Sequence, residues 1–141
     1  MTMIYGVGAD LLDISRMSAL NGNYADPFFV RTFTSGERDQ AASRTDPDAY
    51  FATRFAGKEA VFKCLRIDGD LVRLGDIEII TDTFGVPRVK LNGMLQLVAQ
   101  RKGIQSIHLS LSWDGQYALA FALAVMSSTT RGSSPGNENF Q

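Results

Sequence analysis

One segment near the middle of the chain carries many charges among apolar side chains. It reads RFAGKEAVFKCLR at 54–66 and places one carboxylate, Glu59, among four cations: Arg54, Lys58, Lys63 and Arg66. On a helix of 3.6 residues per turn, these charges border both sides of an apolar stripe. The pattern has two interpretations. The charges are a solvated face with Glu59 and Lys63 as an ordinary i,i+4 pair, or they bind phosphate groups bridged to a divalent cation.

A second carboxylate, Asp10, lies near the end of a predicted strand from Met3 to Leu12. Strand alternation places Gly6, Gly8 and Asp10 on one face. The two glycines either leave an open trough that ends at a carboxylate, or they mark close packing of a helix against the strand. The pattern is not a dinucleotide fingerprint, because a third glycine and a following helix are both missing.

A third set of polar residues lies in a predicted strand at 104–113. Alternation turns His108, Ser110 and Ser112 toward one face. These side chains either line a polar groove, for which their hydrogen-bonding groups are suited, or belong to a solvent-exposed sheet face.

Taken together, the charged residues favour phosphoryl-type transfer from a diphosphate donor. Mg²⁺ is usually bound by one or two carboxylates together with substrate phosphates and water, and Asp10 and Glu59 would supply the carboxylates. The neighbouring cations would offset phosphate charge, while the metal would stabilise charge as a phosphoanhydride is broken. These residues do not identify the donor.

The elements expected around these residues give an α+β fold, with a mainly antiparallel sheet packed against a long central helix and shorter helices. Helix caps and periodicity predict helices over 13–20, after Pro27, from a capping box at Thr34 to about residue 43, from Asp46 to about Arg66, and over 92–102. Strands are expected at 3–12, 77–81, 88–91, 104–113 and 117–126, the last two joined by an Asp-Gly turn.

The bulk properties exclude several classes of protein. With 141 residues we expect one domain at 1–126, followed by a disordered tail at 127–141. Fourteen basic and fifteen acidic residues create no overall field for nucleic acid. No apolar run is long enough to span a membrane, and no signal peptide is present. The single cysteine, Cys64, excludes an internal disulfide and fits a cytoplasmic location.

Four segments in order resemble the 4′-phosphopantetheinyl transferases, specifically the short bacterial holo-(acyl-carrier-protein) synthases. They are GVGADLLDISR at 6–16, FTSGE at 33–37, RFAGKEAVFK at 54–63 and IHLSLS at 107–112. The resemblance covers nearly the whole chain to Met126. It implies the fold of that family and transfer of the 4′-phosphopantetheine group of coenzyme A to a serine of apo acyl carrier protein, releasing adenosine 3′,5′-bisphosphate.

The resemblance also implies the roles of site residues. Asp10 and Glu59 would bind Mg²⁺ together with the coenzyme A diphosphate, and these two residues and Lys63 would form the catalytic group, with Lys63 contacting the diphosphate. Either Glu59 or a metal-bound water would take the serine proton. The remaining nucleotide contacts, including those to the 3′-phosphate, would come from Arg54, Lys58, His108, Ser110 and Ser112.

One departure concerns the residue after Ser112, where family members often have histidine and this chain has Trp113. Alternation turns Trp113 away from His108 and Ser112. We therefore interpret the change as one of support or specificity that leaves the metal site intact, and the role implied for Ser112 is the weakest of the set.

The resemblance further implies a homotrimer with each active site between two subunits. Asp10 and Glu59 would come from one protomer, and His108 or Arg54 from its neighbour. The acidic carrier protein would dock on exposed cations, with Arg16 as the first candidate and Arg31 as the second. The implied setting is fatty acid biosynthesis and lipid metabolism, with polyketide carrier proteins left open.

Two other classes of function fit parts of the pattern. One is a non-catalytic coenzyme A or nucleotide-binding oligomeric module, which would not need both carboxylates. The other is a structural oligomer in which the charged helix only seals an interface, so that Glu59→Gln would alter stability or assembly without a specific loss of activity.

Overall fold

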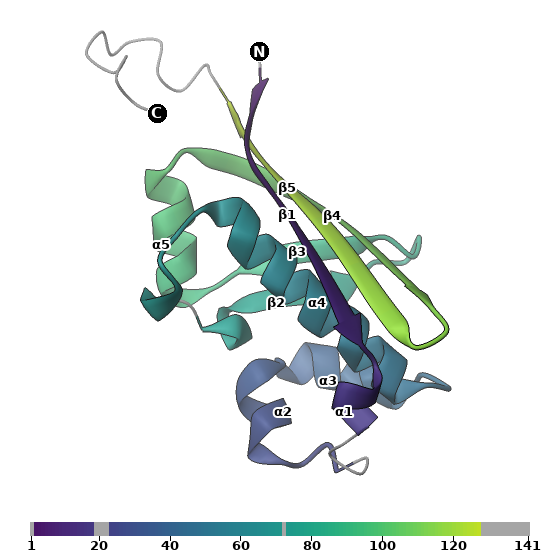
Figure 1. The fold of residues 1–141 in the computed structure, drawn as a ribbon. Helices are drawn as coiled ribbons and strands as arrows, with labels where there is room; N and C mark the ends of the chain where they lie inside the picture. Colours follow the sequence, from purple (N-terminus) through teal and green to yellow (C-terminus); the bar gives the residue numbers. More distant parts are fainter. Residues whose placement is uncertain (1, 19–22, 72, 128–141) are drawn as a thin grey trace, which may run out of the picture.

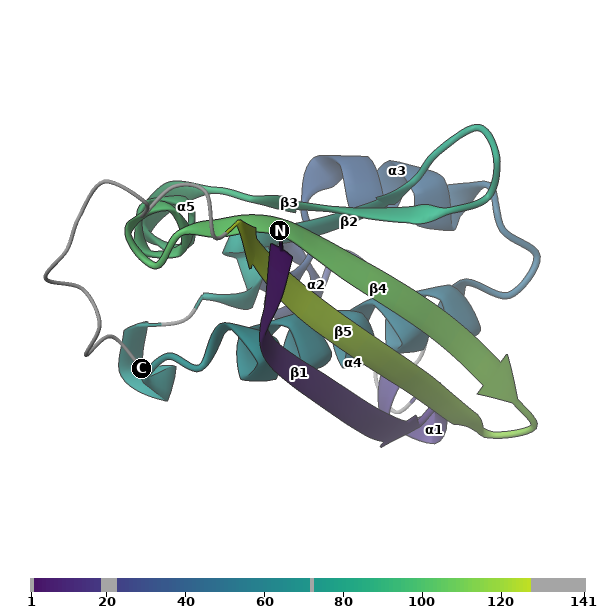
Figure 2. The ribbon, with the colours of Figure 1, turned by 90° about the horizontal axis from the view of Figure 1, so that it is seen from above.

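A three-stranded antiparallel sheet and one long helix form the centre of the molecule. The computed structural model describes residues 2–18, 23–71 and 73–127. The sheet has the order β1-β5-β4, with β1 at Thr2–Asp13, β4 at Ile104–Asp114 and β5 at Tyr117–Ser127. Helix α4, Pro47–Leu65, runs across one face of this sheet (Figures 1 and 2) and contacts all three strands.

The remaining elements surround this centre. Helices α1 (Ser15–Ser18), α2 (Pro27–Thr32) and α3 (Ser35–Ala42) gather toward one end of α4, and α5 (Gly93–Arg101) lies toward the other (Figure 1). Strands β2 (Ile77–Thr81) and β3 (Pro87–Leu91) form a separate antiparallel pair, preceded by short 3₁₀ turns at Gly69–Leu71 and Leu74–Asp76. The expected α+β fold is confirmed.

Local sequence signals explain where the helices begin. The side chain of Asp46 accepts a hydrogen bond from the backbone N–H of Ala49, with Pro47 in the first turn. At the start of α3, Thr34 and Glu37 form the predicted capping box in both directions. Both predicted helix starts are therefore confirmed.

The first helix is shorter than predicted. It begins at Ser15 because the carboxylate of Asp13 accepts a hydrogen bond from the Ser15 N–H and keeps Asp13 in the strand. The end of the predicted helix and part of the following turn, residues 19–22, lie outside the described residues, as does the predicted tail from residue 128. Ser127, assigned to that tail, is the last residue of β5.

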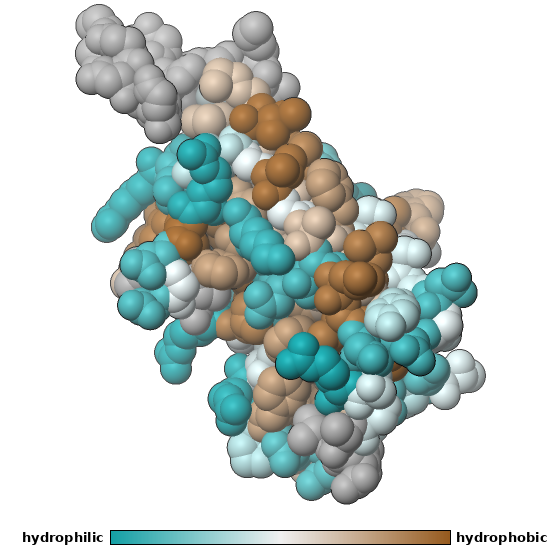
Figure 3. Space-filling model, in the orientation of Figure 1, coloured by the Kyte–Doolittle hydropathy of each residue, from teal (hydrophilic) through white to brown (hydrophobic). Residues whose placement is uncertain are grey.

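The two faces of β5 differ sharply in side-chain size. One face carries alanines at positions 118, 120, 122 and 124, all fully buried, followed by the buried Met126 near the end of the strand. Their small side chains let α4 approach closely, as the sequence predicted, and β5 is the central strand. The opposite face, which we call the outer sheet face, exposes apolar residues of β1 and β5: Ile4, Val7, Leu11, Tyr117, Leu119 and Phe121. Apolar surface extends along β1 in Figure 3.

The glycines of β1 serve helix packing. A Cβ atom at Gly8 would overlap the carbonyl oxygen of Ala60, and one at Gly6 would overlap that of Cys64. The backbone of β1 thus lies directly against α4, and the open-trough interpretation is wrong. Among the described residues, no helix combines the length and apolar character needed to cross a membrane.

Candidate active site

Two carboxylates and one ammonium group meet where β1 crosses α4. The Nζ atom of Lys63 lies 3.4 Å from Oδ1 of Asp10 and donates a hydrogen bond to the carbonyl oxygen of Ala9 at 2.9 Å. Glu59 lies close enough for its pKa to respond to the charges of both Asp10 and Lys63. In the described part of the chain, Lys63 therefore pairs with Asp10, and not with Glu59 as the solvated-face interpretation requires.

The electrostatics of this cluster suit a divalent cation. Partial burial raises the pKa of Glu59, and the negative charge of Asp10 raises it further, while Lys63 lowers it. Two carboxylates that repel each other gain from a cation between them. No group of three or more potential metal-binding side chains occurs within the described ranges, so Asp10 and Glu59 would fill only part of a magnesium shell and leave positions for phosphate and water.

Arg54 lies in a different place, at the first half of α4. It lines a pocket of about 260 Å³ together with residues from the loop before α4, from α4 itself and from the end of β4: Arg44, Thr45, Asp46, Ala49, Tyr50, Thr53, Leu111, Ser112 and Trp113. We call this the arginine pocket. The Arg54 guanidinium packs 4.0 Å from the centroid of the Tyr50 ring and donates hydrogen bonds to Thr53 and Thr81. Burial lowers its pKa, so an anion would compensate for lost solvation.

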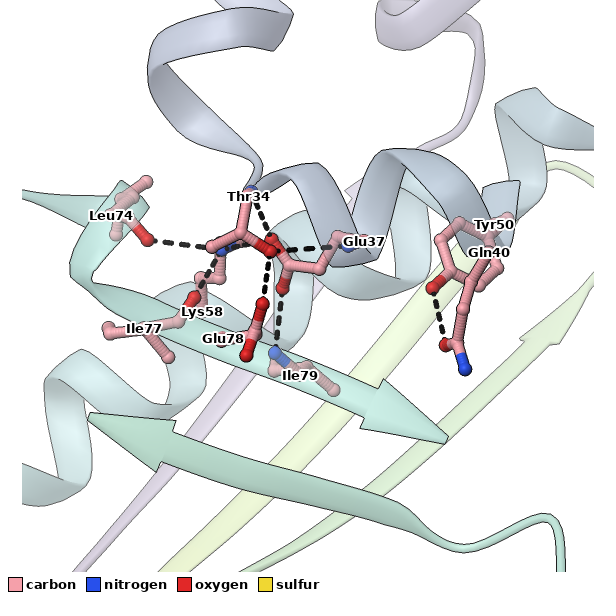
Figure 4. A network of polar contacts seen from close by, with 9 residues as sticks. All are labelled: Thr34, Glu37, Gln40, Tyr50, Lys58, Leu74, Ile77, Glu78 and Ile79. Atoms are coloured by element: carbon pink, nitrogen blue, oxygen red, sulfur yellow. Dashed lines mark hydrogen bonds and ion pairs between the residues drawn. The ribbon is translucent and has the colours of Figure 1, made fainter. Parts of the chain in front are cut away.

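Lys58 is not at the surface, in disagreement with its expected role in nucleotide binding. The side chain is fully buried, and its ammonium group lies 2.8 Å from Oε1 of Glu37. It also donates hydrogen bonds to the carbonyl oxygens of Leu74 and Ile77 (Figure 4). These contacts occupy all three ammonium protons. Lys58 is therefore a structural residue of the core.

The polar row of β4 faces away from the carboxylates. Asp10 lies opposite Ala120 in the β1–β5 pair, on the side of α4. His108 and Ser110 are exposed and lie opposite Leu123 and Phe121, on the outer sheet face. Ser112, on the same side of β4, also reaches the rim of the arginine pocket. Within one chain, His108 and Ser110 do not join Asp10.

The two proposed docking cations lie near each other in space. Arg16 is exposed on α1 and borders an apolar pocket of about 270 Å³ formed with Leu12, Met17, Phe28 and Phe55. Arg31 is exposed on α2, with its guanidinium carbon 5.9 Å from the centre of the Phe28 ring. Phe28 therefore lies near both arginines.

Arg44 and Tyr50 are pocket residues that the sequence analysis did not select. Arg44 lies in the loop before α4, and hydrophobic periodicity does not predict where a loop places its side chains. Tyr50 is indistinguishable in the sequence from an ordinary core aromatic residue. The Arg44 guanidinium lies 5.1 Å from the Tyr50 ring centroid. An aromatic one turn before a helical arginine was the only available hint.

Comparison with known proteins identifies the family. A model described as the 4′-phosphopantetheinyl transferase superfamily matches residues 6–122. The chain belongs to this superfamily. The matched range includes both carboxylates, Lys63 and all the residues that line the arginine pocket.

Individual superfamily members match most of the chain. The holo-[acyl-carrier-protein] synthase of Desulforudis audaxviator is 41% identical over 87% of this chain and 94% of its own length. The crystal structure of the Neisseria meningitidis synthase is 33% identical, with a TM-score of 0.77, covering 86% of this chain and 98% of that one. A Bacillus anthracis synthase in complex with CoA (3′,5′-ADP) is 28% identical, with a TM-score of 0.72, covering 89% and 99%.

Proposed function

We propose that this protein is a holo-[acyl-carrier-protein] synthase, which transfers 4′-phosphopantetheine from coenzyme A to a serine of apo acyl carrier protein. The observation that carries the proposal is the meeting of Asp10, Glu59 and Lys63 at the crossing of β1 and α4. The superfamily match and the similarity to synthases along nearly their whole length support it.

In the proposed reaction, the carrier serine Oγ attacks the phosphorus atom that bears pantetheine. The phosphoanhydride bond breaks, and adenosine 3′,5′-bisphosphate leaves. Asp10 and Glu59 would hold Mg²⁺, which supplies charge stabilisation at the diphosphate when bound. Lys63 would contact the same diphosphate from the side of Asp10. Either Glu59, whose pKa lies above its ordinary value, or a metal-bound water would accept the serine proton.

The proposed assembly is a homotrimer with active sites between subunits. Its support is geometric: His108 and Ser110 face the outer sheet face, whereas Asp10 faces α4. A neighbouring protomer packed on the outer sheet face would cover apolar residues that are now about half exposed, such as Leu119 and Phe121. In such a head-to-tail trimer, the outer sheet face of one protomer, with His108 and Ser110, would lie beside the carboxylates of the next.

Carrier-protein docking and cellular setting complete the proposal. Arg16, with Arg31 nearby, would receive the acidic carrier protein beside the apolar pocket that contains Phe28. The proposed setting is fatty acid biosynthesis or a related acyl-carrier pathway, in agreement with the proposed substrate class. The buried, unpaired Cys64 is compatible with a cytoplasmic location.

The decisive experiment incubates the protein with apo acyl carrier protein, coenzyme A and Mg²⁺. We expect mass spectrometry to detect the phosphopantetheine adduct on the carrier serine, and Asp10→Ala and Glu59→Gln to abolish its formation while circular dichroism shows intact folds. If several carrier proteins stay unmodified beside an active control enzyme, the proposal fails. Coenzyme A binding without adduct formation would instead identify a non-catalytic binding module.

A further inference from the structure

The wall of the arginine pocket includes the single tryptophan of the chain, Trp113. Its side chain is 51% exposed, although indole rings are costly to leave in water. Trp113 lies opposite Ala118, on the side of β4 that faces α4, and so points away from His108 as alternation predicts. The half-exposed ring is therefore part of the pocket wall.

The pocket also carries unbalanced positive charge. Arg44 and Arg54 both lie against the ring of Tyr50, and the charge of Arg44 is near enough to lower the pKa of Arg54. Among the lining residues Asp46 is acidic, but one of its carboxylate oxygens already accepts the hydrogen bond that caps α4. Two guanidinium groups that line one pocket favour the binding of an anion there.

Arg54 itself has an unused donor. Only 9% of the residue is exposed, yet its Nε atom is buried and has no hydrogen-bond partner in the described part of the chain. A buried donor without an acceptor is costly unless a ligand supplies one. With a volume of about 260 Å³, the pocket is suited to one end of a large ligand, because whole drug-sized ligands fill about 300–1,000 Å³.

We propose that Trp113 determines how the nucleotide end of the substrate is recognised, by stacking its indole ring on the purine base while Arg44 and Arg54 bind phosphate. Stacking needs only a flat π face on each partner, which the half-exposed indole provides. This inference rests on the proposed function, in which adenosine 3′,5′-bisphosphate is the leaving half of coenzyme A. Trp113, which stands where family members often have histidine, would thus have a role in recognising the base.

Because the chain has one tryptophan, its fluorescence reports on this contact directly. The wild-type protein is titrated with adenosine 3′,5′-bisphosphate and, separately, with 4′-phosphopantetheine, which carries phosphate but no base. We expect saturable quenching by the first and none by the second. Calorimetry with the bisphosphate then compares variants: Trp113→Leu should weaken binding about 5-fold to 150-fold, the range for loss of one stacked base, and Trp113→Phe by about threefold or less.

The control variant is Met94→Ala, which truncates a side chain of similar exposure on α5, near the opposite end of β4. It should leave the affinity unchanged, and circular dichroism confirms that each variant is folded. The inference is overturned if Trp113→Leu binds the bisphosphate as tightly as wild type, or if phosphopantetheine quenches equally well.

The transfer assay separates this inference from the proposed function. If the wild-type protein is active, the Trp113→Leu variant should have a KM for coenzyme A that is raised by the same factor as its dissociation constant for the bisphosphate. Its kcat should change little. An unchanged KM overturns the stacking role while leaving the transferase intact. Quenching of the wild-type protein together with weaker calorimetric binding of the bisphosphate to Trp113→Leu, in a protein that transfers nothing, would retain the nucleotide contact and reject the proposed function.

Discussion

The Nζ atom of Lys58 lies 2.8 Å from Oε1 of Glu37, and neither side chain is exposed to solvent. The other carboxylate oxygen of Glu37 accepts a hydrogen bond from the backbone N–H of Ile79 at 2.7 Å (Figure 4). This pair therefore joins α3, α4 and β2 in the core. Because Lys58 precedes Glu59, its fixed position also sets the rotation of α4 that brings Glu59 beside Asp10.

Breaking this pair should destabilise the protein more than it affects substrate binding. Lys58→Met leaves the Glu37 carboxylate buried without its cation, and we expect the free energy of unfolding to fall by about 3–5 kcal/mol. Urea denaturation measures the loss. The double variant Lys58→Met, Glu37→Leu should lose less than the sum of the two single variants, because no unpaired buried charge remains.

Arg54→Met is the matched comparison, since it removes the neighbouring cation of the same helix. We expect Arg54→Met to reduce the affinity for coenzyme A more than it reduces the free energy of unfolding, because Arg54 faces a pocket and Lys58 does not. A Lys58→Met protein with wild-type stability would show that the buried pair contributes nothing.

The contrast between Lys58 and Lys63 shows what sequence could and could not predict. Caps and periodicity were sufficient to predict α4, since they act within the segment itself. Both lysines lie beside the apolar stripe, and nothing local decides which is buried. That choice depends on acceptors from α3 and from the segment before β2, such as the Leu74 carbonyl. The ion pair of Asp10 with Lys63 is similarly a tertiary contact: both residues were assigned to one site from the sequence, but their pairing was not predicted.

Gly8 has no room for a side chain, and the metal site should depend on this. Gly8→Ala would push its methyl group into the carbonyl oxygen of Ala60 and to 2.8 Å from Cβ of Lys63. We expect β1 and α4 to separate, with a loss of about 1–3 kcal/mol in unfolding free energy and a reduced rate of transfer. Denaturation and the transfer assay measure the two effects.

Gly69→Ala provides the matched control for that variant. Its new methyl group would meet only the Phe62 ring at 3.6 Å, an ordinary contact, and Gly69 has no left-handed backbone conformation. Stability and activity should both remain near wild type. Equal effects of the two substitutions would mean that the close approach of β1 and α4 is not what matters.

The pKa of Glu59 should respond to its two charged neighbours in opposite directions. Partial burial and Asp10 raise it above 4.5 in the metal-free protein, whereas Lys63 lowers it. Asp10→Asn should therefore lower the Glu59 pKa, and Lys63→Met should raise it. Carboxyl-carbon NMR titrations of the metal-free variants measure both shifts. A pKa that ignores both substitutions contradicts the placement of Glu59 in this cluster.

The raised pKa of Glu59 also determines whether ionisation of this residue stabilises or destabilises the protein as pH changes. A carboxyl group whose pKa is raised in the folded state reduces stability once it is ionised, and this cost grows as pH rises through its unfolded value toward its folded value. Below the unfolded value the cost is absent. Glu59→Gln should thus stabilise the protein at pH 7 and have little effect at about pH 3, as denaturation at both pH values would reveal.

The outer sheet face should control assembly. Phe121 is 46% exposed near the middle of β5, and Phe121→Lys would place a charge in the proposed subunit interface. We expect light scattering to show a monomer and the transfer rate to fall about tenfold or more, since each site would lack its neighbour. Val30→Lys, equally exposed but on α2, should keep the wild-type assembly. A trimer that survives Phe121→Lys places the interface elsewhere.

Arg16 should determine affinity for the carrier protein and not for coenzyme A. It is exposed beside an apolar pocket, where its charge would attract an acidic partner. Arg16→Glu should raise KM for the carrier about tenfold at low salt, with a smaller effect at high salt, because the attraction is screened. KM for coenzyme A should stay unchanged. Lys90→Glu makes the same charge reversal at an exposed position of β3, and an equal rise in KM there would show only a general effect of net charge.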